Sequence, residues 1–206
     1  MEKIAEYTLL NFVVKTFKCA PLYDSVLRAR PSILRLKPKY IIIMSGICNI
    51  TRLEKSGGVR RTYLRHYNPD IALHYYSMEM AAAEHQIGLM ENEGGFSTTL
   101  IFAPLIGCSL TQYNSITYDD WRDLEIQNFL NETIIRINQH IYQINITNQI
   151  LIPHISNQVH HNEHSGIKTH RYQRLHSDGL HFCDDNRAFV AKKLIDCITK
   201  NFYGHL

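Results

Sequence analysis

The stretch YIIIMS, residues 40–45, is a largely apolar run that contains three consecutive β-branched isoleucines and stops at Gly46. A strand with one wet face alternates apolar and polar residues, whereas this run is apolar at almost every position. It therefore predicts a central strand of a parallel sheet. Because ligands of such sheets bind beyond the carboxyl ends of the strands, the residues that follow this run are the first place to look for a site.

Further strands and helices alternate with this one along the chain. Asn68-Pro69-Asp70 is typical of a helix start, with proline in the first turn. Alternation of this kind predicts an α/β fold with helices covering a parallel sheet. The expected strands are 8–17, 40–45 and 97–103, and the expected helices are 70–90, 119–144 and a last helix from about 184 to 200.

Two segments are expected to be less regular. Pro21 and Asp24 open a short helical stretch that we expect to be broken or restarted at Pro31-Ser32. Residues 47–62 contain Gly57-Gly58 and several charges, which is typical of a loop.

Composition limits the kind of protein. The 206 residues are 45% hydrophobic and 20% charged, which suits one globular domain over residues 1–206. The chain has no run of 18 or more apolar residues and no secretory run at its start, so we expect an intracellular, cytoplasmic protein outside membranes. Its five scattered cysteines have no CxxC spacing, so we expect neither a disulfide framework nor a cysteine zinc site.

The net charge of +3 argues against nucleic acid as a partner. Two local features could still contact phosphates or bases. One is the group of basic residues at 28–39, which a solvated helix face also explains. The other is the set of tyrosines between 63 and 76, which lies near Arg60, Arg61 and Arg65.

A short segment near the C-terminus, SDGLH at 177–181, places Asp178 three residues before His181. A histidine that acts as general base needs a carboxylate to fix its tautomer and stabilise its charged form. Taken alone, the pattern is more often an Asp-Gly turn with a capping histidine.

With an amphipathic helix expected after it, this segment resembles the last conserved block of the SGNH (GDSL-type) hydrolases. That block carries their catalytic Asp and His. Residues 41–49 resemble the family's Gly-x-Asn block, whose Asn donates to the oxyanion. The resemblance covers roughly residues 8–200. It implies a three-layer α/β/α, flavodoxin-like parallel sheet, with His181 as base and Asp178 as its orienting carboxylate.

The chain departs from the family pattern at two places. Asn49 falls three residues after Gly46 rather than two, so it is either an oxyanion donor or a side chain that satisfies loop backbone groups. No Gly-Asp-Ser turn, which carries the family's nucleophile, occurs in the sequence. The strand at 8–17 matches the family's second strand, and Ala20 takes roughly the place of its oxyanion glycine. We therefore expect a domain without the usual first strand and its serine.

The resemblance implies an esterase of acyl or acetyl esters that needs no cofactor, and the missing serine implies a degenerate or inactive one. Ser45, Cys19 and Cys48 lie near the expected crevice, but nothing local marks them as reactive. The alternative is a non-catalytic module that binds a protein or nucleic-acid partner. Because the missing strand is central in the family, a homo-oligomer or a partner chain could fill its place.

Histidines are concentrated in residues 153–177, which we expect to form a His-rich loop. His160, His161 and His164 could offer imidazoles to a metal, but the spacing fixes no carboxylate or cysteine partner. We therefore expect a solvated loop and no resident metal, with these three residues as weak candidates.

Overall fold

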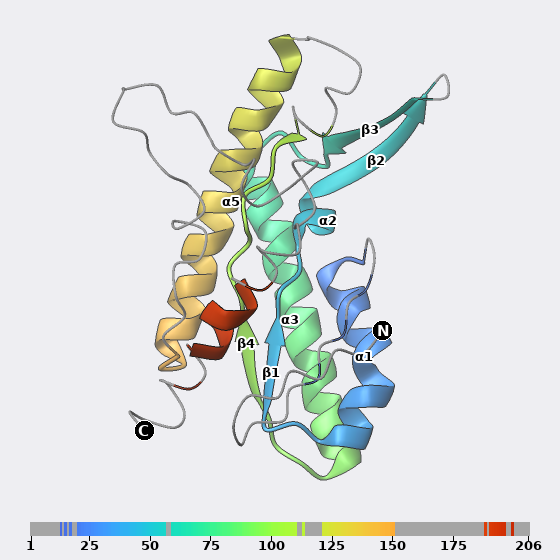
Figure 1. The fold of residues 1–206 in the computed structure, drawn as a ribbon, viewed down its shortest axis with the longest axis vertical. Helices are drawn as coiled ribbons and strands as arrows, with labels where there is room; N and C mark the ends of the chain where they lie inside the picture. The colour runs from blue at the N-terminus through green and yellow to red at the C-terminus, as the bar shows by residue number, and fades with distance from the viewer. Residues whose placement is uncertain are drawn as a thin grey trace.

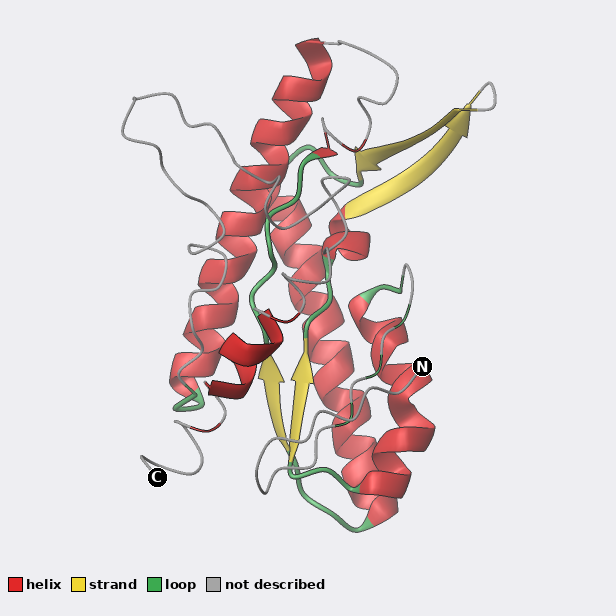
Figure 2. Ribbon diagram, in the orientation of Figure 1, coloured by secondary structure: helices red, strands yellow, loops and turns green. Residues whose placement is uncertain are grey.

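A computed structural model describes the fold of this chain. The described residues are 13, 15, 17, 20–56, 59–110, 113, 121–150, 188, 190–196 and 199. They form a mixed α/β structure in which a small parallel sheet runs beside long helices (Figure 1). Figure 2 shows the two parallel strands at the centre and a separate two-stranded ribbon that projects from the body.

The apolar run at 40–45 is part of a parallel strand, as its composition predicts. Strand β1 (Tyr40–Ile43) pairs in parallel with β4 (Thr99–Phe102), and Ile43 lies opposite Phe102. Alternate side chains of both strands face the main apolar core, which Ile43 and Phe102 join as buried residues. The strand expected at 97–103 is thereby confirmed.

Three long helices build the main core. They are α1 (Leu22–Leu36), α3 (Pro69–Gly94) and α5 (Trp121–Thr147). Helix α3 packs against both of the others. Its buried residues recur three or four positions apart, which gives one continuous apolar stripe along the helix. They are Ala72, Tyr76, Met80, Ala83, Ile87 and Met90.

The start of α3 follows from its sequence. The Asn68 Oδ1 atom accepts hydrogen bonds from the backbone N–H groups of Asp70 and Ile71, at 2.8 and 3.2 Å. These bonds satisfy donors that a helix start leaves without a partner, and Pro69 has no N–H to lose. The helix ends where Gly95 adopts a left-handed conformation, with φ 61°. The expected helices at 70–90 and 119–144 are both confirmed.

Helix α1 corrects the expected break at Pro31-Ser32. The helix continues through Pro31 to Leu36. Proline removes one N–H from the helix ladder, which costs stability. Val26 and Ile33 lie on either side of it and are both buried in the core, so packing holds the two halves in one helix.

The loop expected at 47–62 is also wrong. This segment forms the short helix α2 (Ile47–Ile50) and the strands β2 (Thr51–Ser56) and β3 (Val59–Leu64). The strands pair antiparallel, and Ser56 pairs with Val59 across a two-residue connection. Gly-Gly is a favoured two-residue hairpin connection, so the glycines and charges that suggested a loop belong to a β-hairpin.

Several expectations lie outside the described residues. They include most of the strand at 8–17 and the whole His-rich loop at 153–177. Of the last helix, residues 188, 190–196 and 199 are described and helical. Among the described residues, no helix combines the length and the apolar character needed to cross a membrane.

Candidate functional site

The candidate site lies where β1 ends and α1 begins. The chain leaves β1 through Met44 and Ser45, turns at Gly46 and enters α2, which carries Asn49. Ala20 stands two residues before the first residue of α1. Both segments reach the carboxyl end of β1, which is the end at which α/β sheets bind ligands.

The backbone at Gly46 accepts only glycine. Its φ is 145°, a conformation that L side chains rarely adopt. A Cβ atom at this position would lie 2.4 Å from the Tyr76 ring and 2.6 Å from Leu105. The Tyr76 hydroxyl donates to the Ser45 carbonyl oxygen at 2.8 Å, which fixes the turn against α3. The glycine therefore lets the chain turn tightly at the end of β1.

Asn49 joins this turn to α1. Its Oδ1 atom accepts the backbone N–H of Leu22 at 2.8 Å, and its own N–H donates to the Gly46 carbonyl oxygen at 2.9 Å. The next donor of α1, the N–H of Tyr23, is bonded by Glu79 at 3.1 Å. Residues distant in sequence thus cap α1, because Pro21 provides no side-chain cap. The Asn49 Nδ2 group donates to no residue in the described part of the chain.

Ala20 lies in the same place. It is buried, and its carbonyl oxygen accepts a hydrogen bond from Ser45 Oγ at 3.3 Å. The three residues that the resemblance assigns to the oxyanion, Ala20, Gly46 and Asn49, are therefore linked through Ser45 and Leu22. Both open interpretations of Asn49 remain compatible with this geometry, because its carbonyl caps α1 while its amide nitrogen has no partner among the described residues.

A buried row of amide side chains on α5 fixes the segment that follows β4. Asn138 accepts from the Leu105 N–H at 2.6 Å and donates to the Leu105 carbonyl at 2.8 Å. Gln127 bonds the Leu110 N–H and the Cys108 carbonyl in the same way, at 2.8 and 2.9 Å. These bonds satisfy backbone groups of the segment that follows β4. Our sequence reasoning missed this role, although 127, 131, 138 and 145 recur at helical spacing.

The expected catalytic pair, Asp178 and His181, lies outside the described residues. A few residues further on, Val190 packs with Ile106 in a small apolar cluster that also takes in Met44 and Leu194. Met44 follows β1 and Ile106 follows β4, so this cluster lies at the carboxyl ends of both strands.

Two of the cysteines, Cys48 and Cys108, lie in the described residues as free thiols. Burial, with a smaller contribution from Cys48, raises the pKa of the Cys108 thiol to about 12, so it stays protonated and unreactive at neutral pH. Cys48 is half-buried on α2, and Cys19 lies outside the described residues. The weak metal candidates His160, His161 and His164 also lie outside. No group of three or more His, Cys, Asp and Glu side chains that could hold a metal occurs in the described ranges.

No protein-family model matches this sequence, and a search of curated proteins finds no match.

Proposed function

We propose that this chain is an SGNH-type hydrolase domain, by descent an esterase of acyl or acetyl esters, whose own activity is impaired. The observation that carries the proposal is the meeting of Ala20, Gly46 and Asn49 at the carboxyl end of β1. These residues come from two segments more than 25 positions apart. The family resemblance had selected them from sequence alone.

The proposed architecture is a three-layer α/β/α, flavodoxin-like sheet. Two observations support it. The pairing of β1 with β4 is parallel, with α3 in the connection between the two strands. The cluster around Ile106 and Val190 is separate from the main core that α1, α3 and α5 build, as expected if helices cover two faces.

The proposed reaction uses water in place of the missing serine. His181, held by Asp178, takes a proton from water as the hydroxide oxygen adds to the ester carbonyl carbon. The Asn49 Nδ2 group donates to the oxygen that becomes negative. When the tetrahedral intermediate collapses, its bond to the alkoxy group breaks, and His181 returns the proton to the departing alcohol.

The loss of the nucleophile sets the expected rate. Members of a catalytic triad act as a unit, so hydrolysis without the serine is expected to be slower by about 10³-fold or more. The Ser45 hydroxyl donates to the carbonyl oxygen of Ala20, and the described residues bring no histidine to it. Ser45 therefore has a hydrogen-bonding role within the fold.

Turnover of p-nitrophenyl acetate tests the proposal. The unmodified chain is expected to hydrolyse it slowly but above the buffer rate, and His181→Ala is expected to abolish the excess. A His74→Ala variant, which alters a histidine on α3 away from the candidate site, is the matched control and should keep it. Equal turnover in the unmodified chain and in His181→Ala would refute the site.

A complete absence of turnover would favour the second candidate, a non-catalytic binding module on the same fold. One observation already favours that candidate. The hydrogen bonds described for Asn49 and Ser45 join them to backbone groups of Leu22, Ala20 and Gly46, so they stabilise the fold.

A further inference from the structure

Positive charge is unevenly distributed along this chain. Residues 51–65, which cover β2, β3 and Arg65, contain five Lys and Arg residues and a single acidic residue, Glu54. Residues 28–39, at the end of α1, contain five basic residues and no acidic one. Because the whole chain is only +3, the remainder is net acidic. Either segment could attract a polyanion, although the average charge of the chain does not suggest it.

The basic residues of α1 have roles within the fold. Arg30 forms an ion pair with Glu93 of α3. Arg35 lies in the last turn of α1, and Lys37 follows that turn, where positive charge stabilises the negative end of the helix dipole. The Lys39 ammonium lies 5.3 Å from the centre of the Tyr40 ring.

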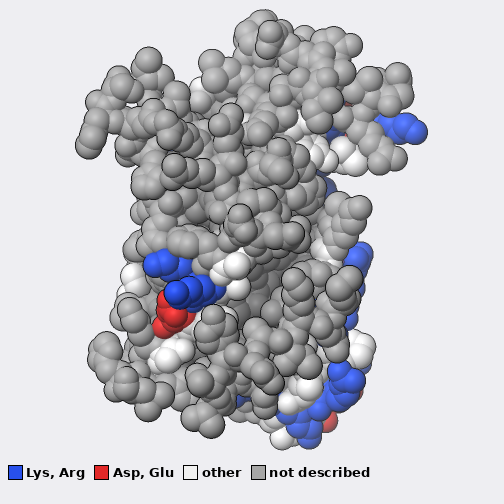
Figure 3. Space-filling model, in the orientation of Figure 1, with Lys and Arg blue, Asp and Glu red and all other residues white. Residues whose placement is uncertain are grey.

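The β2–β3 hairpin, residues 51–64, is here called the arm. It projects from the body, and Figure 3, in the same orientation, shows basic side chains on that side of the molecule. Residues 52–55 are all exposed, and Leu53 keeps 58% of its surface in water. Arg65 ties the base of the arm down by donating to the carbonyl oxygens of Thr51 and Cys48, at 2.9 and 3.2 Å. The arm is thus anchored at its base and exposed at residues 52–55 of β2, whereas Thr62 and Leu64 of β3 are buried.

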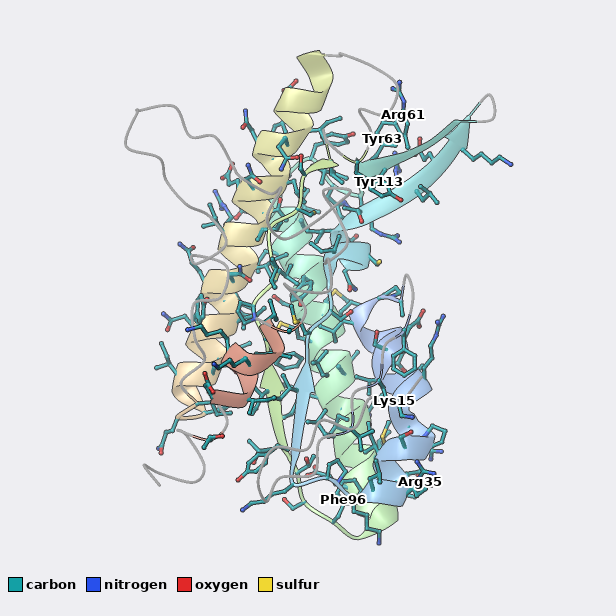
Figure 4. All side chains as sticks on the ribbon, in the orientation of Figure 1. Lys15, Arg35, Arg61, Tyr63, Phe96 and Tyr113 are labelled. Atoms are coloured by element: carbon teal, nitrogen blue, oxygen red, sulfur yellow. The ribbon has the colours of Figure 1, made fainter. Side chains whose placement is uncertain are left out.

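One face of the arm combines arginines with tyrosine. Arg52 lies opposite Tyr63, and Glu54 lies opposite Arg61, so these four side chains share a face. Arg52 pairs with Glu54 at 2.8 Å. The four side chains include two arginines and one carboxylate. Figure 4 shows Arg61 and Tyr63 following one another along β3.

Tyr67 extends this face just beyond β3. It is 47% exposed, and its ring lies edge-on to Phe129, with 6.2 Å between the ring centres. Burial raises the pKa of the Tyr67 hydroxyl, and the positive charge of Arg52 offsets part of that rise. The phenol therefore lies close enough to the arm to interact with the charge of Arg52. The arm face is therefore defined by Arg52, Arg61, Tyr63 and Tyr67.

We propose that the arm face binds single-stranded nucleic acid. Arginines neutralise phosphates and stack on bases, and the exposed ring of Tyr67 offers a further surface for stacking, beside the half-buried ring of Tyr63. Duplex DNA or RNA hides its base faces, so an aromatic surface of this kind favours unpaired bases. The proposal does not depend on the esterase proposal, because none of the four residues belongs to the candidate hydrolase site.

Fluorescence anisotropy with labelled oligonucleotides tests the proposal. Oligo(U) RNA and oligo(dT) DNA of about 12 nucleotides are titrated with the full chain at about 50 and 200 mM salt. The double variant Arg52→Glu/Arg61→Glu is expected to weaken binding at least about tenfold. The matched control Arg28→Glu/Arg35→Glu makes the same change of charge on α1 and is expected to weaken it less than about twofold at the higher salt, where distant charges are screened.

Two single substitutions separate stacking from charge. Tyr67→Ala is expected to weaken binding of single strands about tenfold while leaving the salt dependence unchanged. Glu54→Gln removes the counter-charge of Arg52 and is expected to tighten binding. Thermal unfolding of each variant shows whether it remains folded.

Three results would overturn the proposal. They are no binding at the lower salt, an equal loss in the arm and α1 double variants, and a duplex of the same length bound as tightly as the single strands. The second result would indicate general attraction of polyanions, and the third would indicate recognition of the duplex backbone.

Discussion

The side-chain carbonyl of Asn49 caps the first N–H of α1, that of Leu22, at 2.8 Å and across 27 positions of sequence. A primary amide has two ends with opposite hydrogen-bonding character. At Asn49 the acceptor end is used by the fold, and the donor end bonds to no residue in the described part of the chain. Substitutions that change one end only can therefore separate the two roles.

Removal of the whole side-chain amide of Asn49 should destabilise the fold. Asn49→Ala leaves the Leu22 N–H without its acceptor, and we expect the free energy of unfolding to fall by about 1–2 kcal/mol. Asn49→Asp keeps an acceptor and adds a negative charge at the helix N-terminus, so we expect little loss. Urea unfolding monitored by circular dichroism measures both. Equal stability of the two variants would show that the cap contributes nothing.

Gly46 and Gly88 should respond in opposite ways to alanine. At Gly46 a Cβ would overlap the Tyr76 ring in a backbone conformation that is unfavourable for alanine, so we expect a loss of more than about 2 kcal/mol. At Gly88, inside α3, a Cβ meets nothing within 4 Å, and alanine should stabilise the helix by about 0.5–1 kcal/mol. A melting temperature of Gly46→Ala that does not fall would contradict the tight turn at Gly46, and one of Gly88→Ala that falls would contradict the open space at Gly88.

The amide row on α5 should be a stability determinant. Asn138→Ala removes the two buried hydrogen bonds that its side chain makes with the N–H and the carbonyl oxygen of Leu105. We therefore expect the free energy of unfolding to fall by about 2–4 kcal/mol. Gln139→Ala, at an exposed neighbouring position of the same helix, should cost less than about 0.5 kcal/mol. Denaturant midpoints of the two variants compare the costs directly, and similar midpoints would count against the row.

The Cys108 thiol should react slowly with alkylating reagents, and its burial should make the stability of the fold decrease at alkaline pH. With a pKa raised to about 12 in the folded chain, its thiol should resist alkylation at pH 8, whereas half-buried Cys48 should react faster. Peptide mapping after timed labelling measures both rates. The pKa of the Cys108 thiol is higher in the folded chain than in the unfolded chain, where it is about 8.5. Protonation of the thiol therefore favours the folded state, and this contribution to stability is fully present below the unfolded pKa. This contribution is lost as pH rises from about 8.5 toward 12.

Unfolding measurements across that alkaline range test the pH dependence. The loss of stability with rising pH should be steeper in the unmodified chain than in Cys108→Ala, by up to about 1.4 kcal/mol per pH unit. Identical pH profiles would show that the thiol does not titrate differently in the two states.

Much of the fold could be predicted from local patterns. The run at 40–45, the Asn68-Pro69 helix start and the apolar spacing of α5 each reflect interactions within one element, and sequence periodicity records these directly. The two wrong predictions concern Pro31 and the arm. In both, a breaker residue was given more weight than its surroundings, although packing around Pro31 and antiparallel pairing across Gly57-Gly58 override the local signal.

Less of the site could be predicted, because its contacts join distant segments. The resemblance named Ala20, Gly46 and Asn49, but no pattern in the chain indicates that Asn49 caps α1 or that Glu79 bonds Tyr23. The amide row on α5 was equally hidden, since polar residues at helical spacing usually mark a solvated face. Only the arrangement of the segments shows that these amides are buried against the backbone after β4.

The most direct test of the hydrolase proposal is turnover of p-nitrophenyl acetate by Asn49→Asp. This substitution keeps the cap of α1 and removes the proposed oxyanion donor. We predict a melting temperature close to that of the unmodified chain, together with a kcat/KM lower by about 10²-fold or more, as for loss of one such donor elsewhere. An unchanged kcat/KM in a folded Asn49→Asp variant would contradict the account and leave Asn49 with a role in the fold alone.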